Sequence, residues 1–374
     1  MEIGLHKKLA ACCCLLLLIG LSAGCGQTRQ PAEIGNLSPA VQKALAREDT
    51  PEAIDREFAK RMESQLQGAR KLVQKDGDRI LVKHKYGTTV MPKNPQRIVV
   101  LRLEDLTEAL GVPVVGANYT PRTYLYDRLE QRGVPLLHVN DETKTVNYEE
   151  VQEAKPDLIL LRDSFDQGVY EKLSRIAPVA AFNIRKEETA LLALAMALGQ
   201  EERGIARLEE FYGKAKVYRL GLHAAMGNGT TAFLRVMNRE VRLYPYSRND
   251  INRFMYDLLD LKPSPMVLAA DQSRTNNAIS LEWLPDLEAD YLLVSTGYGA
   301  SSGENGKIAE ERYKKLQQDA LWKSIPAVRQ GHVHVVDNRC VECPWHHRQR
   351  TGHGGNLSDL GICRDGIVKK IKKG

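Results

Sequence analysis

Cysteine is almost absent from most of this chain. Of the seven cysteines among 374 residues, four lie within the first 25 positions, and only Cys340, Cys343 and Cys363 follow. This usage is typical of exported proteins, because stray thiols are a liability where disulfides form. The sequence also contains no H-E-x-x-H motif and no phosphate-binding loop. These two absences disfavour a zinc peptidase and exclude ATP hydrolysis through such a loop.

The chain has few aromatic residues and little excess charge. Aromatic residues make up 6% of the sequence, and the formal net charge is +6. A mildly basic balance suits an anionic partner such as a nucleic acid, a phospholipid surface or an acidic small molecule. No cluster combines basic and aromatic residues, which disfavours the nucleic acid. The 43% hydrophobic content fits a globular protein of one large or two medium domains.

The first 25 residues predict export. Two lysines precede an apolar run from Leu9 to Leu21, and small residues then lead to Cys25. The run is too short and wrongly flanked for a stable spanning helix. Small residues before a cysteine resemble a bacterial lipobox, which implies cleavage before Cys25 and acylation of that residue, although Ser22 stands where leucine is commonest. An ordinary secretory signal with a chance cysteine is the alternative.

Residues 38–75 predict one or two highly charged helices with few apolar positions. Asp49 or Thr50 can cap a helix that starts at Pro51. A helix that is polar nearly all round is solvated or pairs with a partner. We expect a solvated spacer that holds the main body off a membrane, with a partner-binding helix as the alternative.

Beyond Arg79 the pattern alternates between strands and short helices. Residues 79–92 predict a hairpin, and the segments up to residue 182 predict buried strands separated by helices. Residues 187–222 show no strand signal and predict one long helix, with a break near Gly199 as one interpretation. A second alternating region follows. The sequence therefore predicts an α/β protein of two Rossmann-like lobes joined by one long helix.

The predicted organisation has five parts. They are a lipoprotein signal peptide at 1–24, a tether and charged helical extension at 25–78, an N-terminal α/β lobe at 79–188, a linker helix at 189–220 and a C-terminal α/β lobe at 221–374.

Four sequence segments resemble a known protein family, and together they span about Arg79 to Asp337. They are "NPQRIVVL…EALGVPVVGA", "NYEEVQEAKPDLILL", "ISLEWLPDLEADYLLVS" and "ALWKSIPAVRQGHVHVVD". In this order they resemble the siderophore-binding lipoproteins of ABC importers. The resemblance implies the helix-linked (class III) periplasmic-binding-protein fold and a monomeric, lipid-anchored receptor on the extracytoplasmic face of a bacterial membrane. It also implies a ferric siderophore as ligand, a permease and a separate ATPase as partners, no covalent cofactor besides lipid, and no enzymatic activity.

Side chains at strand ends are the candidate ligand contacts. Ligands of open α/β sheets bind beyond the carboxyl ends of the strands, and arginine suits anionic, oxygen-rich ferric complexes. Siderophore-binding relatives often place a ligand arginine at the position of Arg235. A solvated surface charge is the alternative for any one arginine. The candidates are Arg102, Tyr119, Arg122, Arg162, Arg235, Tyr244, Tyr246, Arg248, Tyr298 and Trp345.

The resemblance also implies docking residues. In the family, one acidic residue of each lobe contacts arginines of the permease. The matching positions are Glu149 or Glu150 in "NYEE" and Asp257 in "FMYDLL", where relatives usually carry glutamate. Carboxylates on helix surfaces are more often simply solvated.

The stretch "CVECPWHHRQRTGHGG" at 340–355 allows three interpretations. Cys340, Cys343, His346 and Cys363 could bind zinc, since C-x₂-C is a common half-site. An exported protein favours disulfides or redox-active cysteines instead. The third interpretation is local divergence or a disturbed reading frame. The resemblance to the family stops before this stretch and returns at 365–374.

Two other functions remain alternatives. A protein of the same fold could instead bind haem or cobalamin. Haem needs an axial ligand from the protein. His138, His223 and Met237 could supply one, but none of them stands at an evident strand end. A zinc-dependent hydrolase built on the Cys/His cluster is the alternative from another class.

Overall fold

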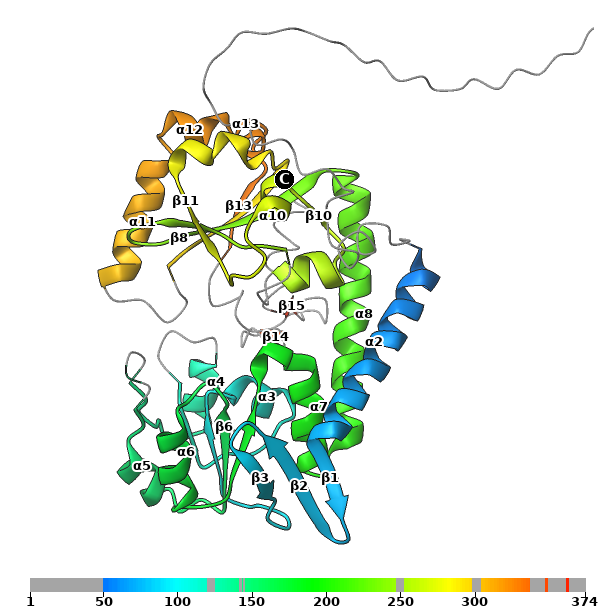
Figure 1. The fold of residues 1–374 in the computed structure, drawn as a ribbon, viewed down its shortest axis with the longest axis vertical. Coiled ribbons are helices and arrows are strands. Elements are labelled where there is room, and N and C mark those ends of the chain that lie inside the picture. Colours follow the sequence, from blue (N-terminus) through cyan, green and yellow to red (C-terminus); the bar gives the residue numbers. More distant parts are fainter. Residues whose placement is uncertain are drawn as a thin grey trace, which may run out of the picture.

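Two α/β lobes lie one above the other, and helix α8 (Glu201–Met226) runs along both (Figure 1). The computed structural model describes residues 50–119, 125–140, 143, 145–246, 252–297 and 304–336, and the backbone of 347–348 and 361–362. This architecture confirms the predicted α/β fold of two lobes joined by a long helix. In the described part of the chain, no helix is both long and apolar enough to cross a membrane.

Lobe one is built on a four-stranded parallel sheet of order β5-β4-β6-β7. The strands β4, β6 and β7 are apolar on both faces, as expected for a parallel sheet covered by helices. Its elements are β4 (Ile98–Leu101), α3 (Glu104–Ala109), β5 (Gly116–Ala117), α4 (Tyr126–Gln131), α5 (Tyr148–Glu153), β6 (Leu158–Arg162), α6 (Gln167–Ser174), β7 (Val179–Phe182) and the 3₁₀ helix η2 (Ile184–Lys186).

A small antiparallel sheet of order β1-β2-β3 precedes lobe one. Strands β2 (Arg79–His84) and β3 (Gly87–Val90) form the hairpin that alternation of polar and apolar residues predicts. Strand β1 (Val73–Asp76) follows α2 directly and pairs with β2, so the N-terminal helix is continuous with the body.

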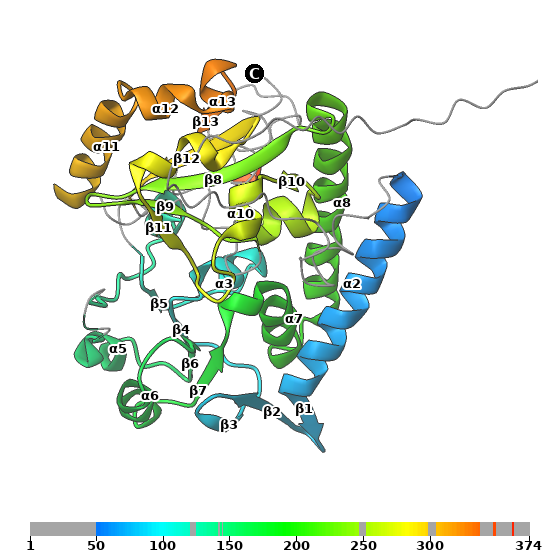
Figure 2. The same ribbon diagram turned by 45° about the horizontal axis from the view of Figure 1, so that its top comes forward.

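Lobe two is built on a mixed sheet of order β11-β9-β8-β12-β13, with β10 beside the start of β8. Figure 2 shows α11, α12 and α13 along one side of this sheet. The strands are β8 (Thr230–Val236), β9 (Val241–Leu243), β10 (Lys262–Pro263), β11 (Asn277–Ile279), β12 (Tyr291–Thr296) and β13 (Val333–Val335). The helices are the π-helix η3 (Arg253–Leu258), α10 (Pro265–Ala269), the 3₁₀ helices η4 (Leu281–Trp283) and η5 (Pro285–Leu287), α11 (Glu304–Leu316), α12 (Ala320–Ser324) and α13 (Pro326–Arg329). Further on, β14 (His347–Arg348) pairs with β15 (Gly361–Ile362).

The linker is two consecutive helices rather than one. Helix α7 (Glu187–Ala197) ends where Gly199 adopts a left-handed φ of +69°, and α8 starts at Glu201. Glycine reaches this conformation without a steric cost, which explains the break at this position. Helix α7 is buried on nearly all sides, whereas α8 alone continues into lobe two.

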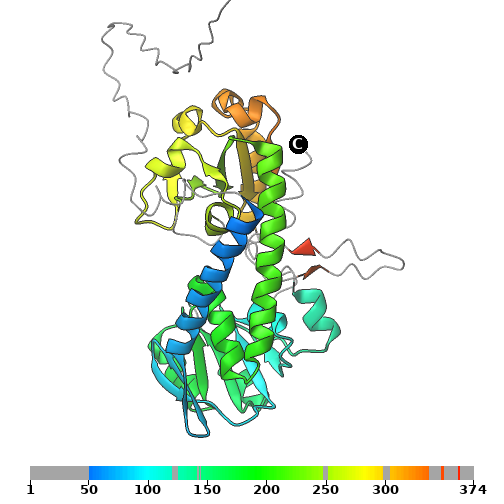
Figure 3. The same cartoon turned by 90° about the vertical axis from the view of Figure 1, so that its right-hand side faces the viewer.

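Helix α2 (Pro51–Leu72) lies along α7 and α8, so the interpretation of residues 51–72 as a solvated spacer is wrong (Figure 3). The Thr50 side chain caps its first turn, as the sequence predicts. Ile54 and Phe58 are among its few apolar residues, and they are buried. Salt bridges from Asp55 to Lys216 and from Arg70 to Glu201 show that α2 runs antiparallel to α8.

Buried charges fasten α2 to the linker. The Arg61 guanidinium donates two hydrogen bonds of 2.8 and 2.7 Å to Glu188 of α7, and the Tyr212 hydroxyl of α8 donates another at 2.7 Å. Burial alone raises the pKa of Glu188, but these bonds outweigh it and hold the pKa below its ordinary value. Arg219 of α8, with 0% of its side chain exposed, bridges Glu57 of α2 and Asp260 of lobe two.

Replacing Arg61 should destabilise the protein strongly. Arg61→Met leaves the carboxylate of Glu188 buried without its cation, which typically costs about 3–5 kcal/mol. Lys60→Met changes an exposed charge on the same helix and should stay within about 0.5 kcal/mol of the wild type. Urea unfolding followed by circular dichroism measures both. Equal stability of the two variants would contradict the packed position of α2.

Candidate functional site

The strand-end arginines of lobe one lie next to each other. In the register of the parallel sheet, Leu101 of β4 pairs with Leu161 of β6. Arg102 and Arg162 directly follow these residues, so their backbones are neighbours on strands about 4.8 Å apart. The carboxyl edge of the sheet therefore has two arginines at adjacent backbone positions, and their contact with a ligand remains a prediction.

Glu104 organises the backbone at this edge. Its Oε1 accepts a hydrogen bond of 3.0 Å from the Arg102 backbone N–H and one of 2.9 Å from the Asn118 backbone N–H. Arg102 has a left-handed φ of +65°, which is uncommon for a residue with a Cβ. Glu104 is only 8% exposed, and burial raises the pKa of its carboxyl to about 7, despite the two backbone bonds and the nearby Arg102 guanidinium.

More cations gather around the end of β6. Lys85, Arg162 and Arg185 all lie close enough to Asp163 to act on its carboxylate, although burial still raises the pKa of that group. Arg185 lies three residues after β7, so the strand-end rule could have identified it. Its backbone carbonyl accepts a hydrogen bond of 2.7 Å from Arg253 of lobe two. Lobe two thus contacts lobe one close to the carboxyl edge of its sheet.

In lobe two, Arg235 lies near the end of the central strand β8. It is buried, and its Nε donates to Ser295 Oγ of β12 at 3.3 Å. Its guanidinium lies over the rings of Phe233 and Tyr244, 5.9 and 5.6 Å from their centroids. Tyr244 follows β9, which runs antiparallel to β8, and its ring packs 5.2 Å from that of Phe233. The structure thus brings two of the candidate residues, Arg235 and Tyr244, into contact, and their role in ligand binding remains a prediction.

Two predicted tyrosines face the interior instead. The Tyr119 hydroxyl donates to the Val134 carbonyl at 2.5 Å, and Tyr246 stacks on Tyr256 with centroids 5.4 Å apart. Both side chains are buried. Their role in ligand contact remains a prediction, but the structure shows a packing role for each.

Several candidates lie outside the described residues. They are the ligand candidates Arg122, Arg248, Tyr298 and Trp345, the lipidation site Cys25, and the zinc candidates Cys340, Cys343, His346 and Cys363. Among the residues that are described, no three His, Cys, Asp or Glu side chains are grouped to hold a metal.

The structure distinguishes the two docking candidates of lobe one. Glu150 accepts a 2.7 Å bond from the His138 backbone N–H and contacts His138 Nδ1 at 2.8 Å. Burial alone raises the pKa of Glu150, but His138 and Asn147 outweigh it and hold the pKa low. Glu149, one residue earlier in the first turn of α5, is exposed. Of the two, Glu149 is the more exposed residue.

The docking candidate of lobe two lies at the contact between the lobes. Asp257 is half-buried on η3 and stands 4.0 Å from Arg253, the residue that bonds to Arg185. It also acts electrostatically on Arg61 of α2. Its docking role remains a prediction, and its neighbours show that it also belongs to an interlobe group of charges.

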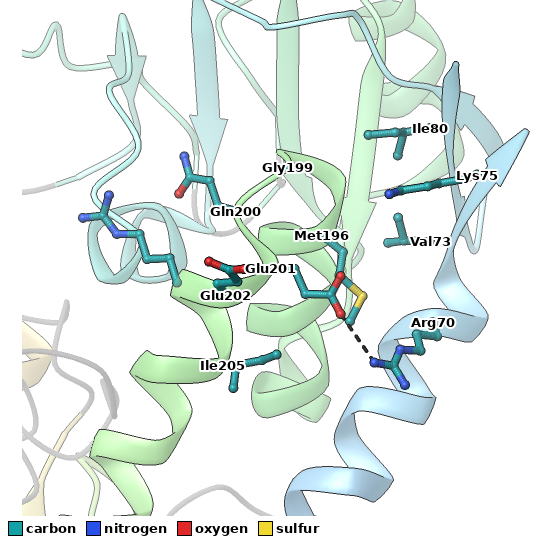
Figure 4. Close-up of a pocket in the computed structure, with 11 residues that line it drawn as sticks. Arg70, Val73, Lys75, Ile80, Met196, Gly199, Gln200, Glu201, Glu202 and Ile205 are labelled. Atoms are coloured by element: carbon teal, nitrogen blue, oxygen red, sulfur yellow. Dashed lines mark ion pairs between the residues drawn. The ribbon is translucent and has the colours of Figure 1, made fainter. Parts of the chain in front are cut away.

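A separate open pocket of about 1100 Å³ lies where α2 and β1 meet the α7–α8 break (Figure 4). The Arg70–Glu201 ion pair of 3.5 Å crosses it. Its lining comes from helix ends and the edge of the small sheet rather than from the carboxyl ends of the parallel strands. It therefore lies apart from the strand-end arginines.

Two lobes joined by a helix, with arginines at the carboxyl ends of both sheets, define the class of helix-linked binding proteins. The periplasmic binding protein family model matches residues 98–340. The chain belongs to the periplasmic binding protein family.

Individual proteins with similar sequences point to the same family. The probable siderophore-binding lipoprotein YfiY of Bacillus subtilis is 30% identical over 270 residues, which cover 69% of this chain and 80% of that protein. The iron(3+)-hydroxamate-binding protein FhuD of Bacillus subtilis is 26% identical over 45% of this chain, and the match spans about half of that relative, 51%.

Solved structures show the same fold. Staphylococcus aureus SirA complexed with staphyloferrin B has a TM-score of 0.58 at 20% identity, covering 78% of this chain and 94% of that one. The catecholate-siderophore binding protein VctP from Vibrio cholerae also has a TM-score of 0.58, at 17% identity over 79% of this chain and 100% of its own.

The raised pKa of Glu104 predicts a pH dependence of stability. The folded-state pKa lies near 7, above the ordinary value of 4.5, so the folded protein binds the proton more tightly than the unfolded chain. This contribution is complete below about pH 4.5 and is lost as the pH rises through 7. Glu104→Gln cannot titrate, so its free energy of unfolding should fall less between pH 4.5 and 7.5. Parallel pH profiles of the two proteins in urea unfolding would contradict the assignment.

Proposed function

We propose that this protein is a lipid-anchored receptor on the extracytoplasmic face of a bacterial membrane. It captures a ferric siderophore between its lobes and delivers it to the permease of an ABC importer, whose ATPase is a separate subunit. The anchor is the acylated Cys25, the protein acts as a monomer, and it is not an enzyme. The named relatives support this proposal, because two of them are described as binding siderophores or ferric hydroxamate.

One observation carries the choice of ligand. Arg102, Arg162 and Arg235 each lie at or near the carboxyl end of a central strand, two in lobe one and one in lobe two. A guanidinium is always charged, is weakly hydrated and offers several donors in a fixed plane. Such groups recognise the oxygen-rich surface of a ferric complex better than they recognise a neutral ligand, which favours anionic carboxylate or catecholate siderophores.

A panel of iron complexes tests the proposal. Purified protein is mixed separately with ferrichrome, ferric staphyloferrin B, a ferric tris-catecholate and haem, and passed through a gel-filtration column. We expect at least one ferric siderophore to co-elute with the protein. If only haem co-elutes with the protein, as a Soret band in the protein fraction would show, the ligand is haem and not a siderophore. If none of the four co-elutes, the proposal of ligand capture is refuted.

Arg235 should contribute directly to affinity. Arg235→Met keeps an apolar stem against Phe233 and Tyr244 but removes the charge. A hydrogen bond to a charged group contributes about 1.5–3 kcal/mol, so we expect the retained complex to bind roughly 10- to 100-fold more weakly in tryptophan quenching. Arg239→Met is the matched control on an exposed arginine of the same region. Unchanged affinity of the Arg235 variant, or an equal loss in the control, would count against this assignment.

Docking to the permease should depend on Glu149. Charge reversal by Glu149→Lys is expected to lower siderophore uptake in cells severalfold, while affinity in solution stays at the wild-type value. Glu153→Lys is the matched control, because Glu153 is also exposed and lies one turn further along α5. Uptake that falls equally in both variants would point to net charge and not to docking at Glu149.

A further inference from the structure

Glu104 joins the ends of two neighbouring strands through a single oxygen atom. Arg102 follows β4 and Asn118 follows β5, and the Glu104 Oε1 accepts the backbone N–H of both. The Asn118 N–H is shared, because it also donates to the Val100 carbonyl of β4 at 3.3 Å, a longer bond than the 2.9 Å to Glu104. The carboxylate therefore ties the backbone of Arg102 to that of Asn118, at strand ends that already pair with each other.

The position of Glu104 in its own helix favours this role. It is the first residue of α3, whose N-cap, Leu103, makes no side-chain capping bond. The Glu104 carboxylate points back to the strands. It holds the residue two positions earlier, Arg102, through that residue's own N–H.

Arg102 needs such support. A left-handed φ costs an L-residue about 1–2 kcal/mol, and such a conformation persists only where the surroundings enforce it. If the N–H of Arg102 lost its acceptor, the backbone could relax to the ordinary β region. The side chain would then leave the strand end in another direction.

Simple packing does not explain the carboxylate. Glu104 lies among buried residues such as Leu106 and Thr107 on the same short helix. Burial of a carboxyl group costs free energy that an apolar side chain of similar size avoids. A residue that only filled space here would stabilise lobe one more as leucine or methionine.

We propose that Glu104 is a positioning residue for ligand capture. Its carboxylate holds the backbone at Arg102 in the left-handed conformation and so directs the guanidinium beyond the edge of the lobe-one sheet. This inference rests on the proposed function, because it assumes that Arg102 contacts the ferric siderophore.

A double-mutant cycle tests the inference. Dissociation constants for ferrichrome, ferric staphyloferrin B and the ferric tris-catecholate are measured by tryptophan quenching for Glu104→Met, Arg102→Met and the double variant. If Glu104 acts through Arg102, each single variant should bind about tenfold more weakly than the wild type, as expected for one lost charge-assisted bond. The double variant should then be no weaker than either single one, because neighbouring residues that act as a unit are not additive.

Conservative variants separate geometry from charge and from stability. Glu104→Gln keeps an oxygen that can accept both N–H bonds and should bind within about twofold of the wild type. Val151→Ala removes buried apolar atoms of α5 and none of the hydrogen bonds of Glu104, so it should lower the melting temperature without weakening binding. If Glu104→Met fails to fold, Glu104→Asp withdraws the carboxylate by about 1.5 Å and should still bind severalfold more weakly.

Three results would overturn the positioning role. They are single-variant losses that multiply in the double variant, wild-type affinity in Glu104→Met or Glu104→Asp, and a loss in Glu104→Gln as large as that in Glu104→Met. A wild-type protein that binds none of the three ferric complexes would instead refute the receptor function. The two failures are therefore distinguishable.

Discussion

The buried ion pair between Arg61 and Glu188 fixes the helices on which the arrangement of the lobes depends. It joins α2 to α7, and the Tyr212 hydroxyl extends the same contact to α8. Helices α7 and α8 are the path by which the chain leaves lobe one and enters lobe two. A charge pair so poorly solvated tolerates little displacement, because either partner alone would be costly to bury. The three helices consequently form one unit, to which each sheet is attached at a different end.

Strand register then decides which side chains can act together. Arg102 and Arg162 are 60 positions apart in the sequence, yet the pairing of β4 with β6 makes them neighbours. Arg235 reaches Ser295 through the pairing of β8 with β12 in the same way. Parallel pairing therefore places residues that are far apart in the sequence next to each other at the ends of neighbouring strands. The contact of Arg253 with Arg185 brings lobe two to the edge of lobe one.

The sequence predicted the fold well because its signals are local. Alternating strands and helices, the Thr50 cap and the break at Gly199 all follow from short-range backbone preferences. Helix α2 was misjudged because its contacts are not local: Arg61 reads as a surface charge until its partner, 127 positions away, is known. The same limit applies to Tyr119 and Tyr246, whose strand-end positions do not show that they point inward. Glu104 carries no sequence signal of its own, because its bonds go to backbone groups.

The packing of α2 has a practical consequence for producing this protein. The family match begins at residue 98, and a gene fragment cut at that boundary would encode neither α2 nor the small sheet that follows it. Such a fragment would present to water the apolar surface that Ile54 and Phe58 normally cover, and the Glu188 carboxylate would lose its Arg61 partner. Exposed apolar surface of this kind promotes aggregation. Recombinant protein intended for ligand or transport assays should therefore start no later than Thr50.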